Sequence, residues 1–407
     1  MSEAAYYHTR YFFSNSHKST LDLESTPGDT LLVEVTYDYM KALPHLLHYM
    51  WSSRMSYIIG CDAHKHYSQF AVYEGDQTRG KQVRVEHERG AIREFLSEFP
   101  EGTPVALESI GNWYWIVDEM EQAGCKPLLA HPAKAKAMMG NVNKTDKLDA
   151  RGLAMLLRNG TLPTVWIAPS QVRDERELPR TRMALCKIRV ALKNRIHASL
   201  AKYNLSLPTE SDIFAPKWNS QLNQVIEQLP AETQKCLQQE LELLDKVQGQ
   251  IDAMEDRMKV CISLTPSMQL LKTVPGVGDI LAIVIGTEIG LIERFSSAEQ
   301  LASYAGTVPA VKSSGGKVRY GHTPKESNHY LKWAFVEAAN GPAQYAKKPH
   351  WQHRHVTRLY ERVKLRKGHS VAVGAVARHL AEATFWILNK NEPYREPTHP
   401  KVLPKQA

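Results

Sequence analysis

The sequence predicts a mixed α/β domain followed by a mostly helical region. Short apolar runs alternate with helical spacing between residues 57 and 158, strand signals disappear after Gln171, and apolar residues recur at steps of three and four from Leu237. The 407 residues are enough for two to three domains, each with its own core. Contents of 43% hydrophobic and 23% charged residues exclude a wholly disordered or collagen-like chain.

The first 54 residues precede the first clear strand signal. They show no amphipathic period and lack the basic, apolar and small-residue parts of a signal peptide. A second methionine, Met55, stands directly before the first strand-like run. Residues 1–54 are therefore predicted to be an N-terminal extension outside the folded core.

Residues 55–165 are predicted to form the α/β domain. Its expected strands are short apolar runs, namely Tyr57–Asp62, Gln69–Tyr73, Gln82–Glu86, Pro104–Glu108 and Pro127–Ala130. Its expected helices have apolar residues at helical spacing, namely Ala91–Phe99, Trp113–Ala123 and Lys144–Arg158. Successive strands followed by alternating helices predict a mixed sheet.

Residues 166–264 are predicted to hold a basic helix and a coiled-coil region. Between Gln171 and Tyr203, nine basic residues stand against three acidic ones. This excess predicts contacts to phosphates, for which the candidates are Arg182, Arg189, Lys193 and Arg195. Further on, a heptad-like seam is made by Leu237, Leu241, Leu244, Val247, Ile251, Met254 and Met258. The two long helices are expected to form either an antiparallel hairpin or an oligomer contact.

Residues 265–345 are predicted to form a compact, glycine-rich helical domain. The run from Pro275 to Gly278 between two apolar helices matches a helix-hairpin-helix, in which Gly276 and Gly278 let backbone N–H groups approach a phosphate. A plain helix–helix turn is the alternative. Residues 346–407 are predicted to be a basic helical tail, and its segment Gln344 to Lys367 is a further candidate for neutralising phosphates.

Charge and cysteine content narrow the partners and the compartment. The net charge of +8 favours a polyanion, either nucleic acid or an anionic membrane. The most apolar run, Ile280 to Ile292, is short of the ~20 residues that span a bilayer, so no membrane partner is expected. The five cysteines are odd in number and widely spaced, which argues against a disulfide framework and favours a reducing cytoplasm.

Four acidic residues are candidates for a metal site. Asp62 and Glu108 each end an apolar strand, and Asp146 and Asp149 share one face of a helix because they are three residues apart. If the sheet brings these carboxylates together, they form an all-oxygen site suited to Mg²⁺ or Mn²⁺, which could activate phosphoryl transfer. The alternative is that they are solvated surface groups. His64, beside Asp62, is expected to be a polar strand-end residue rather than a ligand.

A serine-rich segment is the second candidate for chemistry. Ser313 and Ser314 precede two glycines and stand between Lys312 and Lys317, with Arg319 and Lys325 following as candidate nucleic-acid contacts. On its own the segment is typical of a flexible loop. A serine there could also attack a phosphodiester, provided that a base or a metal site assists the loss of its proton.

These motifs together resemble the DEDD insertion-sequence transposases of the insertion-sequence-110 family, which are related to Piv-type DNA invertases. The resemblance runs from about Tyr57 to Ala339. It includes Gly60-Cys61-Asp62 with Lys65, Ala106-Leu107-Glu108-Ser109 and Lys144-Thr145-Asp146-Lys147-Leu148-Asp149-Ala150, then the Pro-Gly-Val-Gly and Ser-Ser-Gly motifs in the same order. Two features depart from the family pattern: residues 1–54 have no counterpart, and Ser327-Asn328 stands where Gly-Asn is common.

The resemblance implies a RuvC-like, RNase H-like domain in which Asp62, Glu108, Asp146 and Asp149 hold the metal. It also implies that Ser314, or alternatively Ser313, is the nucleophile. Members of the family use a structured guide RNA to pair with donor and target DNA, and they work as homo-oligomers, dimers or tetramers, that combine one subunit's acids with another's serine. The expected protein is thus a cytoplasmic, RNA-guided serine recombinase. Its rivals are a RuvC-like nuclease that uses water and a non-catalytic nucleic-acid-binding remnant.

Overall fold

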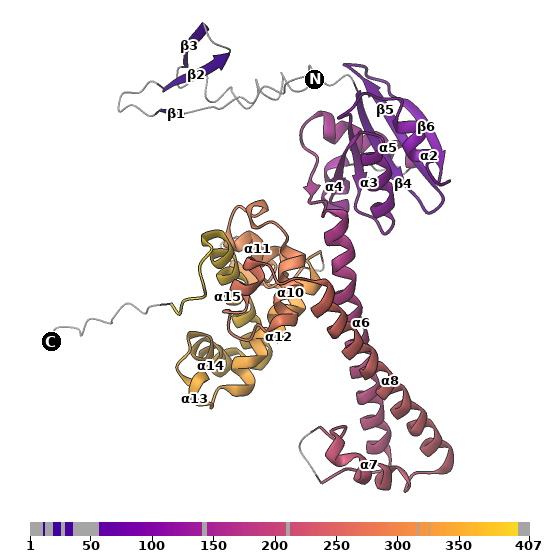
Figure 1. The fold of residues 1–407 in the computed structure, drawn as a ribbon, viewed down its shortest axis with the longest axis vertical. Helices are drawn as coiled ribbons and strands as arrows, with labels where there is room; N and C mark the ends of the chain where they lie inside the picture. Colours follow the sequence, from indigo (N-terminus) through magenta and orange to yellow (C-terminus); the bar gives the residue numbers. More distant parts are fainter. Residues whose placement is uncertain are drawn as a thin grey trace, which may run out of the picture. The chain divides into compact units, whose positions relative to one another are not determined.

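The computed structural model describes residues 11–12, 19–25, 29–35, 57–140, 145–208, 212–315, 317–324 and 326–397 of the chain (Figure 1). The chain divides into two compact units, Met1–Ile167 and Ala168–Ala407. Each unit has its own hydrophobic core. Lys325, expected to contact nucleic acid, and Lys144, expected to begin a helix, lie outside the described residues.

The N-terminal residues include a small antiparallel sheet. Its strands are β1 (Tyr11–Phe12), β2 (Ser19–Ser25) and β3 (Asp29–Val35), in the order β1-β2-β3. No amphipathic period was recognised in residues 1–54, whereas in β2 Leu21 and Leu23 alternate with polar residues.

The first unit contains a six-stranded mixed sheet in the order β6-β5-β4-β7-β8-β9. Its strands are β4 (Tyr57–Ala63), β5 (Tyr67–Glu74), β6 (Lys81–Glu86), β7 (Pro104–Glu108), β8 (Lys126–Ala130) and β9 (Thr164–Val165). β4, β7 and β8 run parallel to one another, whereas β5, β6 and β9 pair in antiparallel fashion. The five predicted strands are confirmed. The two-residue β9 is too short for a periodic signal.

Helices cover both faces of this sheet. They are α2 (Ala91–Leu96), α3 (Trp113–Gln122), α4 (Pro132–Met139) and α5 (Asp146–Arg158). On one face, Ile59 of β4 packs with buried residues of α2 and α3. On the other, Ile58 packs with buried residues of α4 and α5. Neighbouring strand residues thus face opposite cores. The predicted helices are confirmed, and α4 is an addition to them.

A long antiparallel helical hairpin begins the second unit (Figure 1). It is made of α6 (Ser170–Lys202) and α8 (Ala231–Cys261), with a 3₁₀ turn (Pro216–Trp218) and α7 (Asn219–Ile226) between them. Arg182 of α6 bonds to Glu255 of α8, whereas the later Arg195 bonds to the earlier Glu240, which defines the antiparallel direction. Of the two expected arrangements, this chain forms the hairpin. The predicted seam is buried or half-buried, with Leu237 and Ile251 almost fully enclosed.

The rest of the second unit is mostly helical. Its elements are α9 (Pro266–Leu271), α10 (Asp279–Ile289), a 3₁₀ turn (Ile292–Arg294), α11 (Ala298–Tyr304), β10 (Val311–Ser314), β11 (Lys317–Tyr320), α12 (His329–Tyr345), α13 (Pro349–Gln352), α14 (His355–Lys367) and α15 (His369–Lys390). One hydrophobic core joins α9 to α12 with α14 and α15, so the segment expected to be a tail contributes to that core.

Helix α15 is long and apolar enough to cross a membrane by length and composition alone. Half of its most apolar window is buried inside the structure, and Val376, Leu380 and Phe385 belong to the domain core. A core helix of a globular domain passes the same test, so this feature is weak support for a membrane span. Sequence inspection did not single out this helix, because its apolar residues are interrupted by Arg378 and His379.

Candidate active site

Two strand-end carboxylates are neighbours in the sheet. The parallel strands β4 and β7 pair Gly60 with Ala106 and Cys61 with Leu107, so the next positions, Asp62 and Glu108, lie side by side in register. Cys61 and Leu107 are buried in the core that α2 and α3 cover. Because strand residues alternate between faces, Asp62 and Glu108 are directed to the opposite face, the one that α5 covers.

Helix α5 begins over that same face. The Thr145 side chain accepts a hydrogen bond from the backbone N–H of Leu148, which fixes the start of the helix. Asp146 and Asp149 follow in its first turn. The predicted Asp146/Asp149 pair therefore starts the helix that packs on β4, and of the four expected acids, Asp62 and Asp146 lie in one close cluster.

Gly60 allows α5 to approach β4 this closely. A Cβ atom at position 60 would lie 2.0 Å from the backbone oxygen of Ala150 and 2.7 Å from the nitrogen of Ala154. No side chain fits there, because both contacts are with backbone atoms. Gly60 shares its sheet face with Asp62, two residues later. A glycine inside a strand is a recognisable signal of close backbone approach, and Gly60 belongs to the Gly60-Cys61-Asp62 motif of the resemblance.

His64 lies between two of the acids. Its Nε2 atom is 3.2 Å from Asp62 Oδ2 and 3.3 Å from Asp146 Oδ2. One ligand atom from each of these three residues fits within 4.8 Å of the others. The Nε2 atom is buried and has hydrogen-bond geometry to no partner among the described residues. The expectation that His64 is only a polar strand-end residue misses this position at the acids.

Tyr67 completes the arrangement, and sequence inspection did not single it out. Its hydroxyl donates a hydrogen bond of 2.7 Å to Asp146 Oδ2. The intervening turn is closed by the backbone N–H of His64, which donates to the carbonyl of Tyr67 at 2.8 Å. The Asn112 side chain also donates to the His64 carbonyl, at 2.8 Å. The turn between β4 and β5 is thus held on both sides.

The pKa values of Asp62 and Asp146 are shifted in opposite directions. Burial raises the pKa of Asp62, and the neighbouring Asp149 and Asp146 raise it further, while His64 opposes them. The hydrogen bond from Tyr67 lowers the pKa of Asp146. The negative charge of Asp62 is therefore only partly balanced by neighbouring groups of the protein. A divalent cation would supply that compensation, and the two carboxylates of Asp62 and Asp146 with the imidazole nitrogen of His64 fit such an ion.

The serine segment forms a β-hairpin. β10 and β11 pair in antiparallel fashion, with Ser313 opposite Val318 and Ser314 opposite Lys317. Directly opposed residues share a face, so Ser314 lies on the same face as Lys317 and Arg319, and Ser313 lies on the other. Both serines are exposed. The expectation of a flexible loop was wrong for these two serines, which lie in strand β10. The four acids and the two serines belong to different units of the chain.

Two family models match the chain on either side of its middle. Residues 59–205 match the DEDD transposase model of IS110 elements, which is described as a transposase. Residues 268–356 match the model described as the transposase IS116/IS110/IS902 family. The first match contains the four acids and the second contains the serine hairpin.

The chain belongs to the IS110/IS116 family of transposases. The chain is 25% identical to a "Probable family 20 transposase" of Pseudomonas aeruginosa over 343 residues, which are 83% of this chain and 98% of the relative. It is 26% identical to the "Transposase for insertion sequence element IS1111A" of Coxiella burnetii over 302 residues, 72% of this chain and 79% of the relative. Membership implies an enzyme that cleaves DNA strands and transfers them.

The two glycines in the turn from Pro275 to Gly278 have different surroundings. Gly276 has a φ of 84°, and a Cβ there would lie 2.3 Å from the backbone oxygen of Ala338 in α12. Gly276 is therefore needed for packing. Gly278 directly precedes α10 and has open space around it, which suits an approach by a phosphate. Lys272 forms a 2.7 Å ion pair with Asp279 in the first turn of α10.

The four expected cationic contacts of α6 all have polar partners within the second unit, although Arg195 stays 71% exposed. Arg182 pairs with Glu255 and Arg189 donates to Gln248, both on α8. Lys193 pairs with Asp212, and Arg195 pairs with Glu240. These interactions hold the hairpin together and reduce what the four side chains offer to phosphates.

Helix α14 carries exposed basic residues in a regular arrangement. Arg358, Arg362 and Arg366 are spaced four residues apart, so they follow one side of the helix, and all three are exposed. Of the two basic helices expected to contact phosphates, α14 presents these three arginines to solvent, whereas Arg182 and Arg195 of α6 are paired with acids of α8.

Ser327-Asn328, which stands where Gly-Asn is common in the family, fits its surroundings in this structure. The backbone at Ser327 does not adopt a left-handed conformation, so serine fits the turn. A Cβ at Gly306 would lie 2.3 Å from Ser327 Oγ, which shows that residue 306 leaves room for this serine. Asn328 accepts hydrogen bonds from the backbone of Tyr330 and Leu331 and so begins α12.

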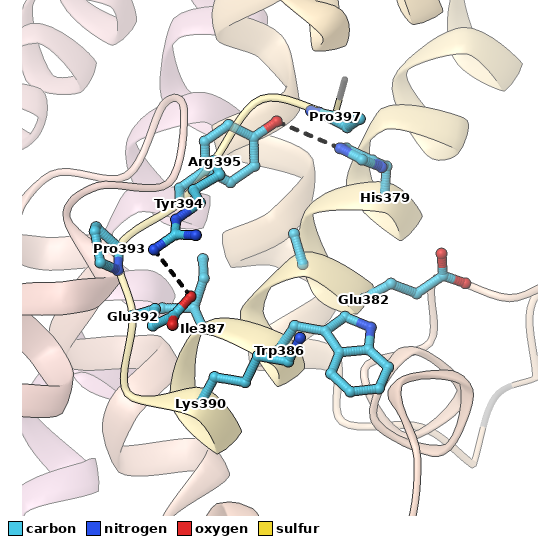
Figure 2. Close-up of a pocket in the computed structure, with 11 residues that line it drawn as sticks. His379, Glu382, Trp386, Ile387, Lys390, Glu392, Pro393, Tyr394, Arg395 and Pro397 are labelled. Atoms are coloured by element: carbon cyan, nitrogen blue, oxygen red, sulfur yellow. Dashed lines mark hydrogen bonds and ion pairs between the residues drawn. The ribbon is translucent and has the colours of Figure 1, made fainter. Parts of the chain in front are cut away.

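A separate pocket of about 420 Å³ lies between α15 and residues 391–397 (Figure 2). Trp386, His379 and Tyr394 are among its lining residues, and the Tyr394 hydroxyl lies 3.4 Å from His379 Nε2. None of the residues predicted to take part in catalysis or nucleic-acid binding lines it.

Proposed function

We propose that this transposase cuts and rejoins DNA with a metal site in its first unit and a serine nucleophile in its second. Asp62, Glu108, Asp146 and Asp149 hold Mg²⁺ or Mn²⁺, and Ser314 attacks the phosphodiester. The observation that carries the proposal is the arrangement of Asp62 and Glu108 on the sheet face over which α5 brings Asp146 and Asp149. A divalent ion there would stabilise charge on the reacting phosphate.

The sheet supports an RNase H-like interpretation of the first unit. Three strands in meander order precede the parallel strands β7 and β8, with helices on both faces. In open α/β sheets the functional residues gather at the carboxyl ends of the central strands. Asp62 and Glu108 occupy those positions on adjacent strands.

The hairpin register favours Ser314 over Ser313 as nucleophile. Ser314 shares a face with Lys317 and Arg319, which would attract a phosphodiester, whereas Ser313 shares its face with Val311, 55% exposed. In the reaction, Ser314 Oγ bonds to phosphorus as the bond to a sugar oxygen breaks, and the proton that the serine gives up ends, by way of solvent, on the departing sugar hydroxyl. A DNA hydroxyl later attacks the same phosphorus and releases the serine. The bond energy is conserved for rejoining.

The proposed partners are those that the resemblance to the family implies. Donor and target DNA are the substrates, a structured guide RNA specifies them, and a dimer or tetramer brings the acids of one subunit to the serine of another. The exposed arginines of α14, the hairpin cations Lys312, Lys317 and Arg319, and the open backbone at Gly278 are the contacts we assign. The glycine turn would act as a helix-hairpin-helix. The site of action is the cytoplasm, where the DNA lies.

One observation favours a second candidate. Because the acids and Ser314 belong to different units, the metal site could also direct water at the phosphodiester without the hairpin. That enzyme would be a nuclease that releases cleaved ends.

Trapping the protein on DNA tests the proposal. We expect the wild type to form a covalent protein–DNA adduct in Mg²⁺, Ser313→Ala to retain it, and Ser314→Ala and Asp62→Asn to lose it. Sequencing the RNA that copurifies identifies the guide. Cleavage by Ser314→Ala without any adduct in the wild type would support the nuclease instead. No cleavage by any variant or by the wild type would indicate a non-catalytic remnant.

A further inference from the structure

We propose that His64 is a ligand of the metal centre and gives it a preference for Mn²⁺ over Mg²⁺. The inference rests on the proposed function, because it needs the acids to bind a metal. It adds an imidazole nitrogen to a set of ligands that otherwise consists of carboxylates.

The position of the imidazole supports coordination. Two ligands at right angles on one metal, each about 2.1 Å from it, stand about 3.0 Å apart. The Nε2 atom of His64 is 3.2 Å from Asp62 Oδ2 and 3.3 Å from Asp146 Oδ2. These spacings are those of adjacent ligands, and small movements of the side chains would admit the ion.

A purely ionic bridge explains the arrangement less well. A protonated His64 would donate its Nε2–H along a lone pair of one carboxylate. The buried Nε2 atom has hydrogen-bond geometry to neither oxygen. It lies within ion-pair distance of both carboxylates at once, and one ligand atom from each of the three residues can share a single cation.

The ring is also held in place before any metal arrives. It stacks on Tyr67, with centroids 4.7 Å apart and an angle of 32° between the planes. The Tyr67 hydroxyl bonds to Asp146 Oδ2, so one side chain orients two of the ligands. Hydrogen bonds from the His64 N–H to Tyr67 and from Asn112 to the His64 carbonyl fix the backbone. Preorganised ligands of this kind are typical of metal sites.

The preference follows from ligand chemistry. Mg²⁺ prefers oxygen ligands and retains its waters, whereas Mn²⁺ accepts carboxylates and also tolerates imidazole nitrogen. A histidine within the ligand set therefore strengthens Mn²⁺ binding more than Mg²⁺ binding.

Pulsed electron paramagnetic resonance of the full-length protein loaded with Mn²⁺ tests the ligand directly. The wild type should show coupling between Mn²⁺ and a ¹⁴N nucleus, and His64→Gln should lose it. His66→Gln is the matched control, because His66 is an exposed histidine two residues away, and it should retain the coupling. Coupling that persists in His64→Gln, or is absent from a wild type with bound Mn²⁺, would overturn the proposal.

Calorimetry with each metal alone tests the preference. His64→Gln should weaken Mn²⁺ binding about tenfold or more and Mg²⁺ binding clearly less. Equal losses for both metals would assign His64 a structural role and contradict the proposal. If Asp62→Asn loses metal binding and the metal-loaded wild type shows no nitrogen coupling, the acid site stands and only the role of His64 is rejected. A wild type that binds neither metal would reject the acid site and His64 together.

Discussion

The acid site and the serine hairpin are built in opposite ways. Asp62 is only 16% exposed and sits where α5 packs directly on β4, with Gly60 leaving no space between them. Ser314 is exposed, and Gly315 beside it has a left-handed φ of 56° and nothing within 4 Å of an added Cβ. The proposed metal ligand Asp62 is therefore positioned by core packing, whereas the proposed nucleophile Ser314 is presented on a surface turn.

Removing the Asp62 charge should produce the largest effect. Burial and like charges raise the pKa of this carboxyl in the fold, so the stability it contributes is present below its unfolded pKa and lost as the pH rises through its folded pKa. At neutral pH without metal, ionised Asp62 thus destabilises the fold. We expect Asp62→Asn to lower strand cleavage by about a thousandfold or more and yet to raise the Tm measured in EDTA.

The same variant should lose the rise in Tm that Mn²⁺ gives the wild type, since binding to the folded state stabilises it. Thermal unfolding with and without EDTA measures both effects. A lower Tm in EDTA would mean that Asp62 stabilises the metal-free fold and is not a strained ligand.

Adding a methyl group to each of the two glycines tests the packing difference. Gly60→Ala should destabilise the first unit by about 3 kcal/mol or more, because the methyl meets backbone atoms of α5. Gly315→Ala should cost only about 1 kcal/mol, because its single penalty is the left-handed backbone. Denaturant unfolding measures both, and Mn²⁺ affinity should fall only in Gly60→Ala. Equal costs would contradict the comparison.

The two basic helices extend the same contrast to nucleic-acid binding. Replacing Arg358, Arg362 or Arg366 by alanine should each lower the slope of log K against log salt by about 1. Arg182→Ala, the matched control, should leave the slope unchanged and lower the Tm, because it leaves Glu255 of α8 without its ion pair. Fluorescence titrations of DNA at several salt concentrations measure the slopes. A reduced slope in Arg182→Ala would assign α6 a direct role at phosphates.

Tyr67→Phe should have the smallest effect. It removes the hydrogen bond that lowers the pKa of Asp146, so this carboxyl would hold its proton to a higher pH. Mn²⁺ binding should therefore begin to fail at a higher pH as the solution is acidified, while affinity at pH 8 changes little. An unshifted pH profile would show that Tyr67 does not influence this ligand.

The sequence signals that placed the four acids at strand ends and on a helix are local, and the structure has those strands and that helix. Asp62 and Glu108 end apolar runs, and Asp146 and Asp149 have helical spacing. The part played by His64 was missed, because it depends on strand register and on the approach of α5, which join residues some eighty positions apart. A short sequence window contains no information on such contacts.

Charge was harder to interpret than hydrophobic pattern. The arginines of α6 form an evident basic cluster, but Glu240 and Glu255, which compensate two of them, belong to α8. The composition of one segment does not show which charges its partner neutralises. The role of α15 in the core was likewise missed, because its histidines and basic residues obscure the buried positions Val376, Leu380 and Phe385.

The most direct test of the account is the location of the metal. Crystals soaked in Mn²⁺ should show an anomalous scattering peak about 2.2 Å from carboxylate oxygens of Asp62 and Asp146, with Glu108 and Asp149 around it. A peak at that place, absent in Asp62→Asn, would establish that the sheet and α5 together form the metal centre. A fully occupied Mn²⁺ elsewhere, with none between Asp62 and Asp146, would contradict it.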